Sequence, residues 1–120
     1  PKQIGMPELH QLTPTLTILQ KRGFKVALVT DGRMSGASGK VPAAIHLVPE
    51  ARDNGVIGKI QTGDIIRLDA INGLLECIDE TVLNRQQRHK DNSGVFGMGR
   101  ELFFNIRNNV SSSEEGASFI

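Results

Sequence analysis

The sequence predicts an α/β domain with a β-rich centre and helices on either side of it. An apolar run at residues 24–30 is typical of a buried strand. The pair Asn72-Gly73, between alternating segments at residues 65–71 and 74–78, is typical of a hairpin turn. Near the N-terminus, leucines recur at the three- and four-residue spacing of an amphipathic helix: Leu9, Leu12, Leu16 and Leu19.

The first helix is predicted over residues 15–22. Pro14 interrupts the leucine pattern, so only a short turn is expected over residues 7–12. Gly23 follows the basic pair Lys21-Arg22, an arrangement that commonly ends a helix.

The strand at residues 24–30 is apolar on both faces, which predicts a central position in a sheet. It is followed by a glycine-rich loop at residues 31–39. Residues 41–47 favour a short helix, with Ser38 as its cap and Pro42 in its first turn. The alternative is an irregular or extended segment, because three residues here are β-branched: Val41, Ile45 and Val48.

The middle of the chain is predicted to be mostly strand. Residues 56–60 are a strand candidate, residues 62–64 a tight turn, and residues 65–71 the first strand of the hairpin. Residues 74–78 return as its second strand.

The C-terminal third is predicted to hold two helices. Charge and spacing favour a short helix at residues 79–88, then a surface loop at residues 89–99 and a closing helix at residues 100–110. Residues 111–120 have the composition of a flexible tail. The apolar side of the closing helix is expected to carry Leu102, Phe103, Ile106 and Val110.

Composition excludes several classes of protein. The 120 residues suit one domain, and a net charge of +1 with 4% aromatic residues argues against a nucleic-acid binder. The single cysteine, Cys77, excludes an internal disulfide and a multi-cysteine metal site, and fits a reducing, cytoplasmic compartment. No apolar run is long enough to span a membrane. Because the chain begins at Pro1 with no structured lead-in, we expect it to be a piece of a longer protein.

The chemistry is concentrated in residues 26–40. A buried strand ends at Thr30, and glycines, serines, Arg33 and Lys40 follow within a few residues. A loop of this kind can present backbone N–H groups, hydroxyls and cations to an anionic ligand. The pattern therefore predicts the functional site in this loop.

The sequence of residues 30–38, Thr-Asp-Gly-Arg-Met-Ser-Gly-Ala-Ser, resembles a C-terminal signature of the dihydroxy-acid and phosphogluconate dehydratase family. Gly-Met-Pro-Glu at residues 5–8 resembles a second segment of that family, and residues 42–51 and 63–66 resemble its downstream pattern. Three segments are most similar to the phosphogluconate branch: residues 8–10, 40–42 and 115–117.

The resemblance implies that residues 1–120 form the C-terminal domain of a longer hydro-lyase, with a swivelling β/β/α fold like that of aconitase-like enzymes. The phosphogluconate branch eliminates water from 6-phospho-D-gluconate to give 2-keto-3-deoxy-6-phosphogluconate, in the Entner–Doudoroff pathway of gluconate metabolism. An iron–sulfur cluster would be held by cysteines of the N-terminal domain. Cys77 lies outside the family's cluster motifs. The implied partners are that N-terminal domain and a second copy in a homodimer, and the isolated piece would be inactive.

Two residues acquire reactive roles from the resemblance. Ser35 aligns with the serine proposed to act, as an alkoxide, as the base that takes the proton beside the carboxylate; the residues alone also allow a turn serine. Glu8 aligns with a carboxylate that binds Mg²⁺, and is otherwise an acid favoured at a helix N-terminus.

The remaining candidates are substrate contacts: Arg33, Gly36, Ser38 and Lys40. Arg33 could hold a carboxylate or phosphate or pair with Asp31, whose role is more simply structural. Ser38 could equally be a helix cap, and Lys40 could be solvated. His46 is interpreted as a structural histidine, while Glu50, His10, His89 and the basic residues 85–90 are interpreted as surface residues. The alternatives left open are dehydration of a branched-chain dihydroxy acid or an unphosphorylated sugar acid, and a phosphate- or carboxylate-binding module without catalysis.

Overall fold

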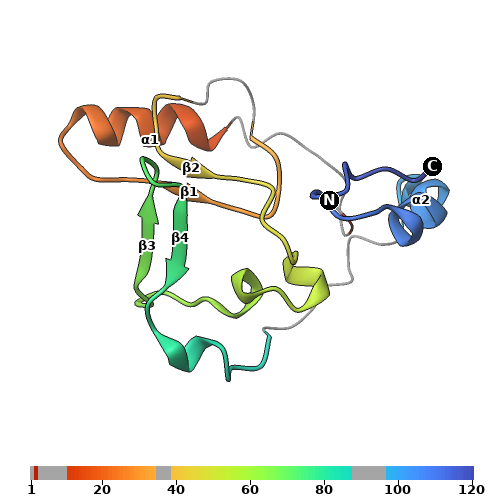
Figure 1. Ribbon diagram of the computed structural model, residues 1–120. Helices are drawn as coiled ribbons and strands as arrows, with labels where there is room; N and C mark the ends of the chain where they lie inside the picture. Colours follow the sequence, from red (N-terminus) through yellow and green to blue (C-terminus); the bar gives the residue numbers. More distant parts are fainter. Residues whose placement is uncertain (1, 3–10, 35–38, 88–96) are drawn as a thin grey trace.

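The structure, a computed structural model, describes residues 2, 11–34, 39–87 and 97–120 (Figure 1). Its first helix, α1, spans Leu12–Lys21, so it begins earlier than predicted. Pro14 lies in the first turn of α1, where the N–H that proline lacks has no partner within the helix anyway. Gly23 ends the helix as predicted: it has a φ of 90°, and its N–H donates to the carbonyl of Gln20.

A parallel strand pair follows α1. β1, Leu28–Val29, pairs with β2, Ala43–Ala44, in the register Leu28 to Ala43 and Val29 to Ala44. β1 is shorter than the predicted strand, and among the described residues it pairs with β2 alone, so the prediction of a central strand is wrong there.

The preferred helix at residues 41–47 is wrong, and the irregular or extended alternative is confirmed: only Ala43–Ala44 is a strand. Around β2, the Leu28 N–H donates to the Pro42 carbonyl and the Thr30 N–H donates to the Ala44 carbonyl. These carbonyls are therefore used by a neighbouring strand, and the β-branched Val41 and Ile45 on either side of the paired residues disfavour a helix here.

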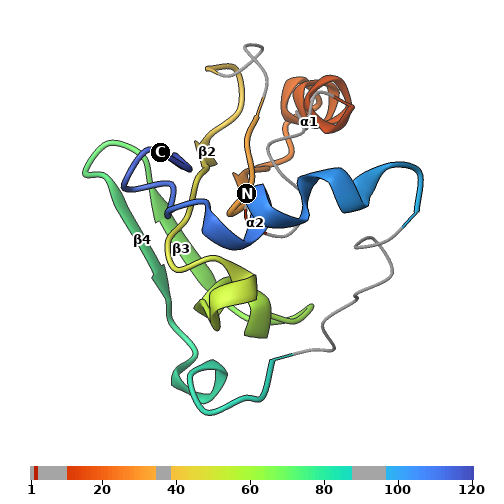
Figure 2. The ribbon, with the colours of Figure 1, turned by 90° about the vertical axis from the view of Figure 1, so that its right-hand side faces the viewer.

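The predicted hairpin is confirmed. β3, Ile66–Asp69, and β4, Leu74–Cys77, pair antiparallel, with Asp69 opposite Leu74. The Asp69 carboxylate accepts hydrogen bonds from the backbone N–H groups of Ile71 and Asn72, both at 3.0 Å, which shapes the turn. Figure 2 shows β2 between this hairpin and α1, which is seen end-on.

Two predicted elements are instead short 3₁₀ helices. Residues 56–60 do not form a strand; Val56–Lys59 turns, and the Gly58 N–H donates to the Gly55 carbonyl. The chain passes so close to the Pro49 carbonyl here that position 55 has no room for a Cβ. The predicted helix at residues 79–88 is reduced to Glu80–Val82, which begins where the Asp79 carboxylate accepts a hydrogen bond from the Thr81 N–H at 3.0 Å.

The predicted closing helix is confirmed as a 3₁₀ turn, Arg100–Phe103, that continues into α2, Phe104–Asn109. Its apolar side chains are exposed, in contrast to a helix packed on a core: Leu102 is 82% exposed, and Phe103, Phe104 and Ile106 are also exposed. The last residues form a turn in which the Ser111 N–H donates to the Ser118 carbonyl at 2.8 Å; flexibility of this tail stays a prediction.

The hydrophobic core is small. Among the described residues, the buried apolar side chains are Met34, Val41 and Val82, and Val82 is fully buried. A half-open cavity of about 290 Å³ lies between the strand pair and the hairpin, with Val29, Leu47, Ile57, Ile66, Leu75 and Cys77 among its lining residues. None of the helices described here has both the length and the apolar character needed to cross a bilayer.

Candidate functional site

The glycine-rich loop connects β1 to β2, and backbone hydrogen bonds fix its base. The Thr30 N–H donates to the Ala44 carbonyl at 2.9 Å, and the His46 N–H donates to the Gly32 carbonyl at 3.0 Å. The Gly32 N–H in turn donates to the Thr30 hydroxyl oxygen at 2.9 Å. The parallel pairing thus continues past β1 into the first residues of the loop.

Buried side chains anchor the loop on each side of residues 35–38. Met34 is 8% exposed and Val41 is 5% exposed, so the backbone is fixed just before and just after this segment. The Gln20 side-chain amide of α1 also donates to the Lys40 carbonyl at 2.6 Å. A hollow of about 490 Å³ lies beside this end of the loop, with Gln20, Met34, Lys40 and Ile45 among its lining residues.

The structure places two of the predicted site residues. Arg33 and Lys40 are both exposed, one at each end of the loop. Ser35, Gly36 and Ser38 lie outside the described residues, as does Glu8, so their predicted roles stay predictions.

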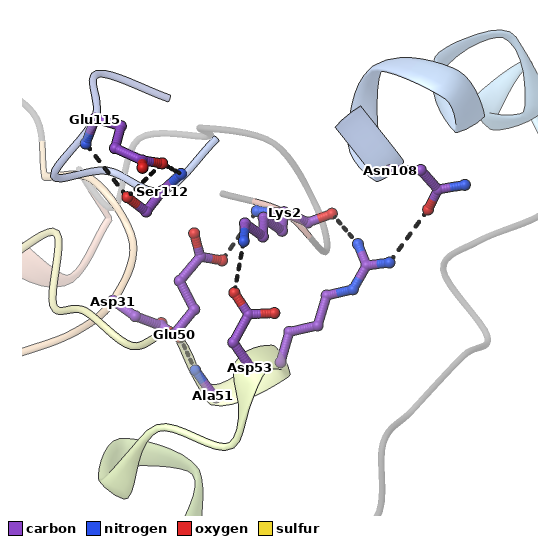
Figure 3. Close-up of polar contacts among 9 residues, drawn as sticks. Lys2, Asp31, Glu50, Ala51, Asp53, Asn108, Ser112 and Glu115 are labelled. Atoms are coloured by element: carbon purple, nitrogen blue, oxygen red, sulfur yellow. Dashed lines mark hydrogen bonds and ion pairs between the residues drawn. The ribbon is translucent and has the colours of Figure 1, made fainter. Parts of the chain in front are cut away.

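Asp31 has the structural role that the sequence favoured. Its Oδ2 accepts a hydrogen bond from the Ala51 N–H at 2.8 Å, which joins the start of the loop to the segment after β2 (Figure 3).

Glu50 was interpreted as a surface residue, and that is wrong: it is 3% exposed. Its carbonyl accepts hydrogen bonds from the N–H groups of Asp53 and Gly55, so a tight turn folds over it. Its Oε2 accepts a hydrogen bond from the backbone N–H of Lys2 at 2.9 Å. The signal that could have located it is Asn54-Gly55, which allows the chain to turn back within a few residues of Glu50.

The turn beside Glu50 also contacts Lys2, near the N-terminus, and α2, near the C-terminus. The Lys2 ammonium lies 2.7 Å from the Asp53 carboxylate, and this hydrogen bond raises the pKa of Lys2 above its ordinary value. Arg52 donates to the Lys2 carbonyl and, through Nη2 at 3.3 Å, to the Asn108 side-chain oxygen of α2 (Figure 3). Residues from three distant parts of the sequence therefore meet next to Asp31.

Other residues set aside in the sequence have clear positions. His46 has a φ of 57°, and its backbone joins the loop base, while the structural role of its imidazole stays a prediction. Arg85, expected at the surface, is half-buried and paired with Asp64. Cys77 is half-buried, and its thiol contacts the Asp79 carbonyl at 3.7 Å. His10 and His89 lie outside the described residues.

The described part of the chain holds no cluster of three or more His, Cys, Asp or Glu side chains that could bind a metal ion. An iron–sulfur cluster needs several cysteine thiolates, and this chain has one cysteine. The residues present therefore do not fit such a cluster by themselves.

Comparison with known proteins identifies the family. The profile of the family described as "Dihydroxy-acid/6-phosphogluconate dehydratase C-terminal" matches residues 1–117. The chain is 56% identical to the phosphogluconate dehydratases of Rhizobium meliloti, over 100% of its length, and Pseudomonas aeruginosa, over 98%. It is 42% identical to a dihydroxy-acid dehydratase of Prochlorococcus marinus, over 95% of its length.

The chain spans about a fifth of the length of these relatives: 20% of the first two and 21% of the third. The family predicted from residues 5–8 and 30–38 is therefore confirmed. The chain belongs to the dihydroxy-acid/6-phosphogluconate dehydratase family, within that family's C-terminal region.

Proposed function

We propose that this chain is the C-terminal domain of a phosphogluconate dehydratase, a hydro-lyase that converts 6-phospho-D-gluconate to 2-keto-3-deoxy-6-phosphogluconate in gluconate metabolism. The observation that carries this proposal is the higher identity to phosphogluconate dehydratases, 56%, than to the dihydroxy-acid dehydratase, 42%. The loop at residues 31–39 supports it, because its base and both flanks are fixed by the contacts described above.

Ser35 is the proposed base. Its alkoxide takes the proton from the carbon beside the substrate carboxylate, the electron pair of that C–H bond forms a double bond, and hydroxide leaves the next carbon. The proton taken by Ser35 and the hydroxide together make the water that is released, and the resulting enol tautomerises to the 2-keto acid. A serine hydroxyl is a weak acid, so neighbouring N–H groups or a metal ion must stabilise the alkoxide.

Arg33 is proposed to bind the substrate carboxylate, since a guanidinium can make two parallel hydrogen bonds to it. Gly36, Ser38 and Lys40 are proposed as further substrate contacts. The iron–sulfur cluster is proposed to lie in the N-terminal domain. Glu8 is proposed as a single carboxylate ligand of Mg²⁺, an ion that typically takes one or two carboxylates in such sites.

The exposed apolar side chains of residues 102–106 are proposed to pack against the rest of the same protein. The swivelling β/β/α fold, a cytoplasmic location and a homodimer of the complete protein are further proposals from family membership. Because the site then needs both domains, the isolated chain is proposed to be inactive.

The test uses the complete protein with Ser35→Ala. Formation of 2-keto acid from 6-phosphogluconate should fall at least about 100-fold, the usual effect of losing a catalytic base. Ser111→Ala, in the C-terminal turn, is the control and should leave the rate unchanged. Near-normal turnover by Ser35→Ala would remove the proposed base. Faster turnover of gluconate or a branched-chain dihydroxy acid by the unaltered protein would reassign its substrate.

A further inference from the structure

A second hollow lies between α1 and the C-terminal end of the loop. It measures about 310 Å³ and is lined by Thr17, Gln20, Lys21 and Lys40, all of them polar. It shares Gln20 and Lys40 with the larger hollow beside the loop. The hydrogen bond from the Gln20 amide to the Lys40 carbonyl, at 2.6 Å, holds the backbone of Lys40 against the helix that carries Lys21. The two lysines are therefore kept on one hollow by the fold.

This part of the chain is strongly cationic, although the whole chain is nearly neutral. Residues 9–49 contain five lysines or arginines and one acidic residue, a net charge of +4, against +1 for all 120 residues. The acidic residue is Asp31, whose carboxylate accepts a hydrogen bond from the Ala51 N–H. No ion pair joins Lys21 or Lys40 to any carboxylate among the described residues. Cations gathered without carboxylate partners favour the binding of an anion.

The other polar groups of the hollow are poorly suited to attract an anion. The Thr17 hydroxyl donates to the Thr13 carbonyl at 2.8 Å, so its proton is already used. The C-terminal end of α1 carries the negative end of the helix dipole, which disfavours an anion. Attraction must therefore come from the ammonium groups of Lys21 and Lys40, and a dianion such as phosphate matches two of them.

We propose that Lys21 and Lys40 bind the phosphate group of the substrate in this hollow. The proposal rests on the proposed function, and it adds a helix residue, Lys21, that no motif indicated. In a sugar acid phosphorylated at the far end of its carbon chain, the reacting carbons and the phosphate need separate subsites. Ser35 and Lys40, on the same loop, would serve one each.

The test is made on the complete protein with Lys40→Gln and Lys21→Gln. Calorimetry, on proteins that also carry Ser35→Ala so that the substrate is not turned over, gives the dissociation constants of 6-phosphogluconate and of gluconate, and their ratio measures recognition of the phosphate. Each variant should lower the preference for the phosphorylated ligand about tenfold or more, the usual effect of losing a charge-assisted hydrogen bond. Lys40→Arg should retain part of it.

Lys25→Gln is the matched control, because Lys25 is exposed on the segment after α1 and does not line the hollow. It should leave the ratio unchanged. An unaltered ratio in both the Lys21 and Lys40 variants, or an equal loss in the control, would overturn the proposal. If the unaltered protein binds 6-phosphogluconate without dehydrating it, the proposed function fails, while the same ratio still decides whether this hollow binds phosphate.

Discussion

The Arg85 guanidinium makes two hydrogen bonds to the Asp64 carboxylate, from Nη1 to Oδ2 at 2.6 Å and from Nη2 to Oδ1 at 2.9 Å. The same carboxylate accepts a hydrogen bond from the Gln61 N–H at 2.7 Å. The pair thus joins the segment after β4 to the turn that precedes β3. The hydrogen bonds from Arg85, the larger cause, and from the Gln61 N–H hold the pKa of Asp64 below its ordinary value.

The first prediction follows from the sign of that shift. Hydrogen bonds in the folded state favour the ionised form of Asp64, so the pair stabilises the fold at pH values above the ordinary aspartate pKa of about 3.9. This contribution is lost as the pH falls through the lowered pKa of Asp64. Arg85→Met should lower the thermal midpoint of the complete protein at neutral pH and much less in acid. Arg67→Met is the control: Arg67 pairs with Glu76 at 3.1 Å on the surface, where an ion pair contributes little. Equal shifts in the two variants would contradict the assignment.

The second prediction concerns the hydrogen bond between the Ala51 N–H and Asp31. Asp31→Ala should free this amide and loosen the start of the loop, at a cost of about 1.5–3 kcal/mol, the value of a hydrogen bond to a charged group. Turnover should fall, and hydrogen exchange at Ala51 should accelerate. Asp31→Asn keeps an acceptor oxygen and should restore much of both. If turnover falls with no change in exchange at Ala51, Asp31 acts on the substrate rather than through the loop.

Local patterns predicted the elements whose hydrogen bonds are local. The Asn72-Gly73 turn and the α1 stop at Gly23 needed only neighbouring residues, and both are confirmed. Residues 41–47 were mispredicted because their partners on β1 are distant in sequence. The burial of Glu50 escaped prediction for a similar reason, since it depends on Lys2 and on the turn at Gly55.

The chemistry of the residues located the candidate loop, but the reactive residue within it was identified by family resemblance. Glycines and hydroxyls indicated an anion-binding loop, but Ser35 stood out through the family resemblance. Lys21 was interpreted only as a charge at the end of a helix, because nothing in the sequence shows that α1 packs beside Lys40. A site assembled from a helix and a loop that are distant in sequence cannot be predicted from local patterns.

The third prediction is that Gly55→Ala destabilises the fold. A Cβ at this position would lie 1.8 Å from the Pro49 carbonyl oxygen and 2.8 Å from that of Glu50, both backbone atoms that cannot easily move. The cost should be about 3 kcal/mol, at the upper end for overpacking. Gly58→Ala is the control: its closest contact, at 2.4 Å, is the end of the Gln87 side chain, which can turn away. Thermal unfolding of the complete protein should rank Gly55→Ala as the less stable; the reverse order would contradict this packing.

The fourth prediction tests the proposed packing of α2 and the turn before it. Leu102 is 82% exposed in this chain, while the Asn108 side chain of α2 accepts a hydrogen bond from Arg52. One part of this helical segment is thus held to the domain, and its apolar side chains are left uncovered. Burying a leucine stabilises a protein by about 1.5–3 kcal/mol. If the rest of the protein covers Leu102, Leu102→Gln should lower the thermal midpoint of the complete protein.

Asn105→Gln, at an exposed polar position of α2 directly after that turn, is the control for Leu102→Gln and should have little effect. Sedimentation distinguishes packing against another domain of the same chain from packing against a second copy in the proposed homodimer. If Leu102→Gln lowers the midpoint while the oligomeric state is unchanged, Leu102 packs against a domain of its own chain. If the oligomer dissociates instead, Leu102 lies between two copies. A midpoint equal to that of the control would show that Leu102 stays in solvent in the complete protein, and would contradict the proposed packing of this surface.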